Sequence, residues 1–161
     1  MARTLFIIII IFAGAYLASQ AFYALSDFVG SDGTEVEETQ VYINDAVFVA
    51  ETARTQEEVS TGLSGRPRLA KNKGMLFIFS TAGFYQFWMP NMHFPIDIIW
   101  INDSKVVDIT ENVSNIFDPA NPTYYRPSEA VNYVLEVNAG SVLRHGIKVG
   151  DSVFIETLPS R

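Results

Sequence analysis

The chain has 161 residues, of which 48% are hydrophobic and 18% are charged, and this length leaves room for one compact domain rather than two large ones. Its formal net charge of −7 repels phosphate backbones, so the composition argues against a nucleic-acid partner. The chain contains no cysteine, which excludes disulfides, thiolate metal sites and thiol nucleophiles.

The stretch from Leu5 to Leu25 carries no charged side chain over 21 residues. As a helix it would span roughly 31 Å, which matches the hydrocarbon core of a bilayer. Arg3 precedes the stretch and the next five charged residues after it are acidic, so the positive-inside rule places the N-terminus in the cytoplasm. We therefore expect residues 1–25 to be a single-pass anchor in the cytoplasmic (inner) membrane, with the body in the periplasm or the extracellular space.

A cleaved signal peptide is the alternative for this segment, because Ala-Gly-Ala at residues 13–15 forms a small-residue cleavage site. Both interpretations export the body of the protein. Residues 26–40 follow with five acidic residues, no basic residue and two glycines, which is typical of a solvated linker.

Residues 41–158 consist of short runs rich in valine, isoleucine and aromatic residues, separated by glycine, proline and asparagine. Such runs predict a mainly β (α+β) domain, barrel-like or sandwich-like, with one or two short helices. One run is apolar on both faces except for Asp97 and should lie inside the sheet, and the turn residues that follow it predict a hairpin over residues 96–112. The expected strands cover residues 41–50, 75–79, 84–89, 96–101, 131–137 and 153–157.

Two short helical segments are expected within this domain. Thr55, followed three residues later by Glu58, forms a capping box that predicts a helix ending near Gly62 or Gly65. One or two helical turns are also expected within residues 139–145.

Two loops are candidate binding surfaces. The first, which we call the basic loop, is rich in proline, asparagine and glycine and contains Arg66, Arg68, Lys71 and Lys73. The second covers residues 114–130 and is too long for a tight turn, so it is the best candidate for a functional loop. Its aromatic and proline-rich part, residues 117–127, which we call the aromatic-proline loop, contains Tyr124, Tyr125 and Arg126.

A family resemblance rests on four segments, namely RTQEEVSTGLSGRPRL from Arg54, GMLFIF from Gly74, FWMPNMHFPIDIIWI from Phe87 and YVLEVNAGSVLRHGIKVGDSV from Tyr133. These segments resemble the domain of unknown function 192 family, and the resemblance extends over residues 41–156. Family members usually have a basic or polar residue where this chain has Pro90, and a leucine where it has Ile96. The resemblance implies a small, mostly β domain that often follows a signal or anchor segment. It implies no agreed activity.

Asp97 and Glu136 are the two acidic residues that the pattern places on buried strands. A carboxylate in such a position must be paired or uncharged. We expect Asp97 to be held by backbone N–H groups, or by Arg54 or Arg66. The alternative is a catalytic acid with a raised pKa.

The two acids also define an alternative function. In a small extracytoplasmic enzyme, Asp97 or Glu136 would act as acid or base in a cleft beside Trp88 and Asn91, and the two would form a carboxylate pair if they faced one cleft. The pattern alone does not show which face of the sheet each acid occupies.

A second alternative is a copper-handling protein, because thioethers and an imidazole are soft ligands that suit Cu(I). The residues that would form this site are Met75, Met89, Met92 and His93. The simpler interpretation is that the methionines fill gaps in the core. We therefore expect no metal and no other cofactor.

The sequence as a whole favours a binding or accessory module over an enzyme. We expect a membrane-anchored extracytoplasmic module that acts alone or as a subunit of a larger membrane complex. The membrane, contacted through the stretch from Leu5 to Leu25, is its first expected partner.

Overall fold

The computed structural model describes residues 36–157 of the chain. The predicted anchor and most of the predicted linker lie outside these residues. Within the described part, no helix is long and apolar enough to cross a membrane.

The domain formed by these residues is built on one seven-stranded sheet in the order β5-β4-β6-β3-β2-β1-β7. Neighbouring strands are antiparallel except β2 and β3, which are parallel because α2 lies in the connection between them. The elements are β1 (Glu38–Ile43), β2 (Ala46–Ala53), α2 (Gln56–Thr61), β3 (Lys73–Gly83), β4 (Ile96–Asn102), β5 (Lys105–Val113), β6 (Val131–Asn138), α3 (Ser141–His145) and β7 (Val153–Thr157).

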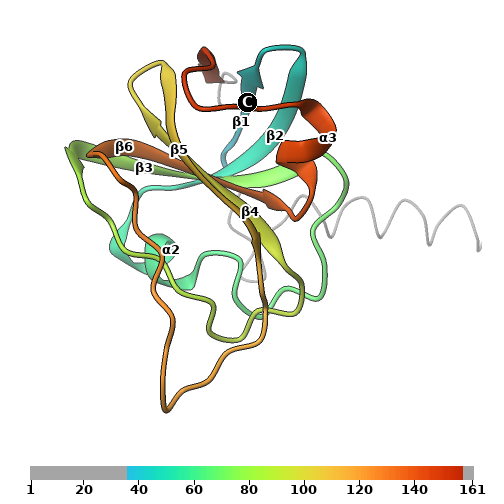
Figure 1. Cartoon of the computed structure of the whole chain (residues 1–161), viewed down its shortest axis with the longest axis vertical. Helices are drawn as coiled ribbons and strands as arrows, with labels where there is room; N and C mark the ends of the chain where they lie inside the picture. Colours follow the sequence, from blue (N-terminus) through green and yellow to red (C-terminus); the bar gives the residue numbers. More distant parts are fainter. Residues whose placement is uncertain (1–35, 158–161) are drawn as a thin grey trace, which may run out of the picture. The chain divides into compact units, whose positions relative to one another are not determined.

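The sheet curls until its two edge strands meet at one end (Figure 1). Lys105 at the start of β5 forms an isolated bridge with Ser152, just before β7. The backbone N–H of Val106 donates to the carbonyl of Asp151 at 3.0 Å, and Gly150 donates back to Val106 at 2.8 Å. These bonds make the domain barrel-like, and the prediction of a mainly β fold with two short helices is confirmed.

Two separate cores lie on the two faces of the curled sheet. The inner core receives buried side chains from all seven strands and from α3, including Phe48, Leu76 and Ile101. The outer core lies on the other face of β3, β4 and β6 and is built around Phe77 and Trp100. Because β4 contributes to both cores, its first six residues are all buried, as expected for a strand inside the sheet.

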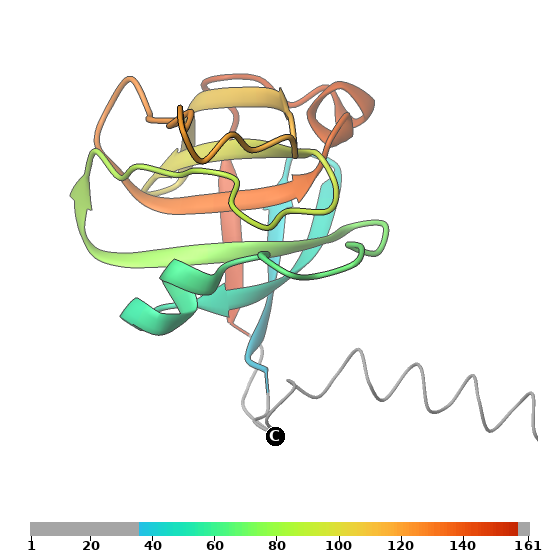
Figure 2. The ribbon, with the colours of Figure 1, turned by 90° about the horizontal axis from the view of Figure 1, so that it is seen from below.

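Three segments cover the outer core, namely α2 with the turn after it, residues 84–95, and the long loop of residues 114–130. They lie on the same side of β3, β4 and β6 in Figure 1. Figure 2 shows the same arrangement from below, with residues 84–95 and the long loop running across the sheet. This layer of irregular chain is where a site has room to form.

Two of the expected strands differ from the structure. The expected strand at residues 41–50 is a hairpin, because Asn44 adopts a left-handed conformation (φ 53°) and starts a turn between β1 and β2. The hairpin also begins earlier, since Glu38 already lies in β1. Residues 84–89 form no strand and make one isolated bridge, between Phe87 and Tyr125. Both neighbours of β3 are already in place, so this segment crosses the sheet face instead of joining the sheet.

Candidate functional site

Glu136 is a buried acid on β6 that faces the outer core. Its neighbours along β6 face the inner core, while Met75 of β3 and Ile98 of β4 lie beside it in register. Its exposed fraction is 5%, and no hydrogen bond from the described part of the chain acts on its carboxyl group. Burial alone raises the pKa of Glu136 to about 8, so the side chain is mostly uncharged at neutral pH.

Glu136 lines a pocket of about 500 Å³ in the layer that covers the outer core. The walls come from α2 and the turn after it, from β3, and from residues 85–92. Seven of the lining residues are aromatic or methionine, namely Phe77, Phe79, Tyr85, Phe87, Trp88, Met89 and Met92. A largely apolar cavity with a single buried acid is a typical small-molecule site.

Ring contacts hold the aromatic walls in place. Phe87 contacts Phe77 edge to face, with ring centroids 4.8 Å apart, and contacts Trp100 in the same way at 5.5 Å. Phe79 and Tyr85 stack on each other nearby. Aromatic pairs in these geometries are mutually stabilising, so the wall is largely formed before any ligand arrives.

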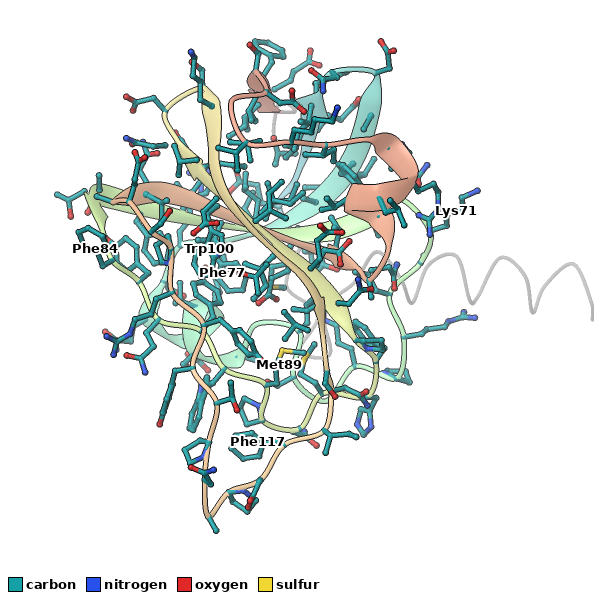
Figure 3. The ribbon with its side chains drawn as sticks, in the orientation of Figure 1. Lys71, Phe77, Phe84, Met89, Trp100 and Phe117 are labelled. Carbon is teal, nitrogen blue, oxygen red and sulfur yellow. The ribbon has the colours of Figure 1, made fainter. Side chains whose placement is uncertain are left out.

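The rim of the pocket continues into an exposed aromatic cluster. Trp88 is 47% exposed, stacks on Tyr124 at 5.8 Å and meets the edge of Phe117 at 5.7 Å. Figure 3 shows Phe77 close to the sheet, Met89 farther out and Phe117 on the long loop. The aromatic-proline loop therefore reaches the pocket through Trp88.

Two tight turns close one side of the pocket. Asn91 has a left-handed backbone (φ 54°), which asparagine tolerates better than most residues, and Gly65 has a φ of 76°. The carbonyl of Asn91 accepts a hydrogen bond from the N–H of Gly65 at 2.8 Å, and Ser64 Oγ donates to the carbonyl of Pro90 at 3.0 Å. Asn91 therefore joins the two turns.

Asp97 lies on the opposite face of the sheet from Glu136. It is fully buried, and its two carboxylate oxygens accept hydrogen bonds from the backbone N–H groups of Asn112 at 2.8 Å and Val142 at 2.9 Å. Val142 lies in the first turn of α3, whose own N-terminal residue Gly140 has no side chain to cap it. The two acids therefore do not face one cleft, and the predicted acid and base pair does not form.

Four of the six candidate basic residues are held by a polar side chain, and the two others are Arg68 and Lys71. Arg54 pairs with Glu37 at 3.0 Å, and Lys73 pairs with Glu38 at 2.5 Å. Both terminal nitrogens of Arg66 bind Glu51 at 2.5 Å, and the pKa of Arg66 is raised above its ordinary value by this hydrogen bond. The guanidinium of Arg126 binds Gln86.

The basic loop and the aromatic-proline loop do not come together. Arg68 and Lys71 are exposed, and Lys71 lies well away from Phe117 in Figure 3. Tyr125 exchanges backbone hydrogen bonds with Phe87 at 2.8 and 2.9 Å and so anchors the long loop over the pocket wall.

The candidate copper ligands occupy different environments. Met75, Met89 and Met92 are buried in the outer core, whereas His93 is exposed. Within the described residues, no cluster of three histidine, aspartate or glutamate side chains is placed to hold a metal ion. The methionines lie among apolar side chains, and Met89 and Met92 line the pocket.

The enzyme alternative placed Asp97 or Glu136 in a cleft beside Trp88 and Asn91, and the structure brings Glu136 and Trp88 into one pocket whose described lining includes neither Asp97 nor Asn91. The alternating phenylalanines Phe77 and Phe79 mark one face of β3, which is a signal that the sequence does contain. No local sequence signal indicates that residues 84–95 and α2 lie over this face.

The curled sheet and its covered outer face define a small, mainly β domain with one aromatic-walled pocket. The chain belongs to the DUF192 family, described as "Uncharacterized ACR", which matches residues 39–155. No curated protein matches the chain at a significant level.

Two solved structures share the fold. A "putative transcription regulator" from Sinorhizobium meliloti 1021 is 30% identical, with a TM-score of 0.69, and the match covers 78% of this chain and 98% of that one. A protein of unknown function from Novosphingobium aromaticivorans DSM 12444 is 33% identical, with a TM-score of 0.67, and the match covers 78% of this chain and 90% of that one.

Proposed function

We propose that this protein is an extracytoplasmic ligand-binding module, held at the outer face of the cytoplasmic membrane by the stretch from Leu5 to Leu25. It would act alone or as a subunit of a larger membrane complex. The anchor is supported by the length of the uncharged stretch and by the charges that flank it.

The observation that carries the binding function is the pocket of about 500 Å³ with Glu136 in its wall. Its volume falls within the range of small-molecule sites, roughly 300 to 1,000 Å³. Its aromatic walls offer apolar contact, and its buried carboxyl offers one directional polar contact. A site of this composition selects a ligand that is mostly apolar and has one polar group.

Fluorine NMR tests the proposal with the full-length chain in lipid nanodiscs. The probes are three small aromatic compounds that differ in charge: 4-fluorophenethylamine, 4-fluorophenethyl alcohol and 3-(4-fluorophenyl)propanoate. Ser60 is exposed on α2 and lines the pocket, so S60W should obstruct it without disturbing the core. Ser104 lies in the exposed turn between β4 and β5, outside the pocket lining, and S104W is the matched control.

The proposal predicts that at least one probe is broadened by the wild type and by S104W, and that S60W abolishes this broadening. Equal broadening by all three proteins, or none by any of them, would argue against a ligand pocket at this place.

A second candidate function is an enzyme in which Glu136 donates and accepts a proton. The observation that favours it is the pKa of about 8, which suits proton transfer near neutral pH. Binding remains the better supported function, because Glu136 is the only acidic residue among the described residues that line the pocket. Recovery of a bound ligand chemically unchanged after incubation would support binding, whereas its conversion would support the enzyme.

A further inference from the structure

The buried carboxyl of Glu136 lacks a partner that the rest of the described chain could supply. Its neighbours in the sheet, Met75 and Ile98, have no hydrogen-bond donor to offer. A carboxyl group in the wall of a pocket is stabilised when a bound ligand donates a hydrogen bond to it. Glu136 therefore gives the pocket a specific chemical requirement for a ligand group that donates hydrogen bonds.

Two arginines on this side of the sheet, Arg54 and Arg66, are already paired with other carboxylates. Arg66 lies on the same sheet face, beyond Met75, and is paired with Glu51, whose position on β2 is in register with Met75. Arg54 lines the pocket and is paired with Glu37. The remaining titratable group in the described lining is Tyr85, whose hydroxyl donates to the carbonyl of Thr81.

The walls around Glu136 favour a positively charged partner over a neutral one. The faces of aromatic rings attract cations, most strongly where water is excluded, and the pocket has five aromatic side chains. The field of the whole chain acts in the same direction. Residues 26–161 contain 10 basic and 18 acidic residues, a formal charge of −8 that attracts cations and repels anions.

We propose that the ligand is an aryl- or alkyl-amine whose ammonium group pairs with Glu136 and whose apolar part lies against Phe77, Phe87 and Trp88. This inference rests on the proposed binding function and names the class of ligand for the same pocket.

Binding of such a ligand is coupled to the release of a proton. In the empty pocket near neutral pH the carboxyl holds its proton. The arriving ammonium keeps its own protons and forms N–H to carboxylate hydrogen bonds, and the proton from Glu136 leaves to the solvent. One ammonium enters and one proton leaves, so the charge of the site does not change. Because the pKa of empty Glu136 is about 8, close to one proton is released at pH 7 and few are released above pH 9.

Calorimetry on the full-length chain in nanodiscs measures both affinity and proton release. 4-Fluorophenethylamine and 4-fluorophenethyl alcohol are titrated at pH 7 in phosphate and in Tris, two buffers with very different ionisation enthalpies. E136Q keeps the size and shape of the side chain but cannot carry a negative charge, and it also corrects for partition of the probes into lipid. S104W is the control outside the pocket.

The inference predicts that the amine binds at least tenfold more tightly than the alcohol, with close to one proton released, and that E136Q removes both effects while S104W keeps them. Equal or tighter binding of the alcohol without proton release would overturn the amine as ligand class and leave the binding function standing. If neither probe binds, the result would count against both the ligand class and the proposed function.

Discussion

Asp97 and Glu136 are two buried acids on the neighbouring strands β4 and β6, and their surroundings give them different roles. Asp97 has two backbone N–H donors and joins β4 to the start of α3. Glu136 has no donor within the described chain and lines a pocket. The presence or absence of donors, rather than depth of burial, separates a structural carboxylate from a candidate binding group.

We predict that Asp97→Asn lowers the free energy of unfolding by about 1 to 3 kcal/mol, because an amide nitrogen would then face one of the two N–H groups. Denaturant unfolding of the full-length chain, followed by tryptophan emission, measures the change. Asp103→Asn is the matched control, since Asp103 lies in an exposed turn with φ 51°, where asparagine is well tolerated. An equal effect of both variants would show that Asp97 does not hold α3.

We predict that Glu136 makes the stability of the protein depend on pH in a specific window. The folded chain holds this proton up to about pH 8, whereas the unfolded chain releases it near the ordinary pKa of 4.5. The stabilisation is therefore complete below about pH 4.5 and is lost as the pH rises to about 8, at no more than about 1.4 kcal/mol per pH unit.

The difference in unfolding free energy between E136Q and the wild type isolates this effect, because other groups titrate equally in both proteins. E136Q should gain relative stability between pH 4.5 and 8 and then level off. A difference that stays constant across this window would mean that Glu136 titrates normally in the folded protein.

At the scale of elements, sequence signals were sufficient for some local features but not for the hairpin of β1 and β2, which turns at Asn44. The capping box of Thr55 and Glu58 forms as predicted, and α2 ends at Gly62. The hairpin of β4 and β5 turns at Asp103 as its turn residues indicate. The alternation of polar and apolar residues could not show that Asp97 and Glu136 face opposite sides of the sheet. Their relative orientation depends on the register between β4 and β6, which are far apart in sequence, and in that register Asp97 lies opposite Val137.

The segment at residues 84–89 shows that composition alone does not predict a strand. Its aromatic residues favour a strand, but a strand also needs a free sheet edge, and β3 already has β2 and β6 as neighbours. Composition likewise could not show the walls of the pocket, which come from segments that meet only in the folded chain.

β3 and β6 approach closely beside Glu136, and Gly74 makes this possible. A Cβ at Gly74 would lie 2.8 Å from the backbone carbonyl oxygen of Glu136, which is closer than van der Waals contact allows. We predict that Gly74→Ala costs about 1 to 3 kcal/mol of stability, as overpacking does in other cores. Denaturant unfolding measures this change in the free energy of unfolding.

Gly83, at the far end of β3, provides the control for this substitution. The three atoms nearest to a Cβ there belong to the side chain of Tyr85, at 3.2 Å or more, and none of them is backbone. Gly83→Ala should therefore cost less than Gly74→Ala, and the reverse order would contradict the close approach of the strands.

At the scale of the whole molecule, the proposed anchor would decide where the pocket works. We predict that the mature protein keeps residues 1–25, so its intact mass should equal the 18.0 kDa of the full chain, and it should stay in the membrane fraction after an alkaline wash. A mature N-terminus at Tyr16, or elsewhere within the uncharged stretch, would leave an exported protein without an anchor.

The outer face of the domain holds a pocket whose buried acid, Glu136, receives no hydrogen bond from the described part of the chain and has a raised pKa. Carbon-13 NMR of the glutamate side-chain carboxyl groups, with E136Q to assign the resonance, measures this directly in the full-length chain without ligand. Glu136 should titrate with a midpoint near pH 8. A midpoint near the ordinary value of 4.5 would show a carboxyl in free contact with water or bound to a donor, and would contradict the account of the pocket.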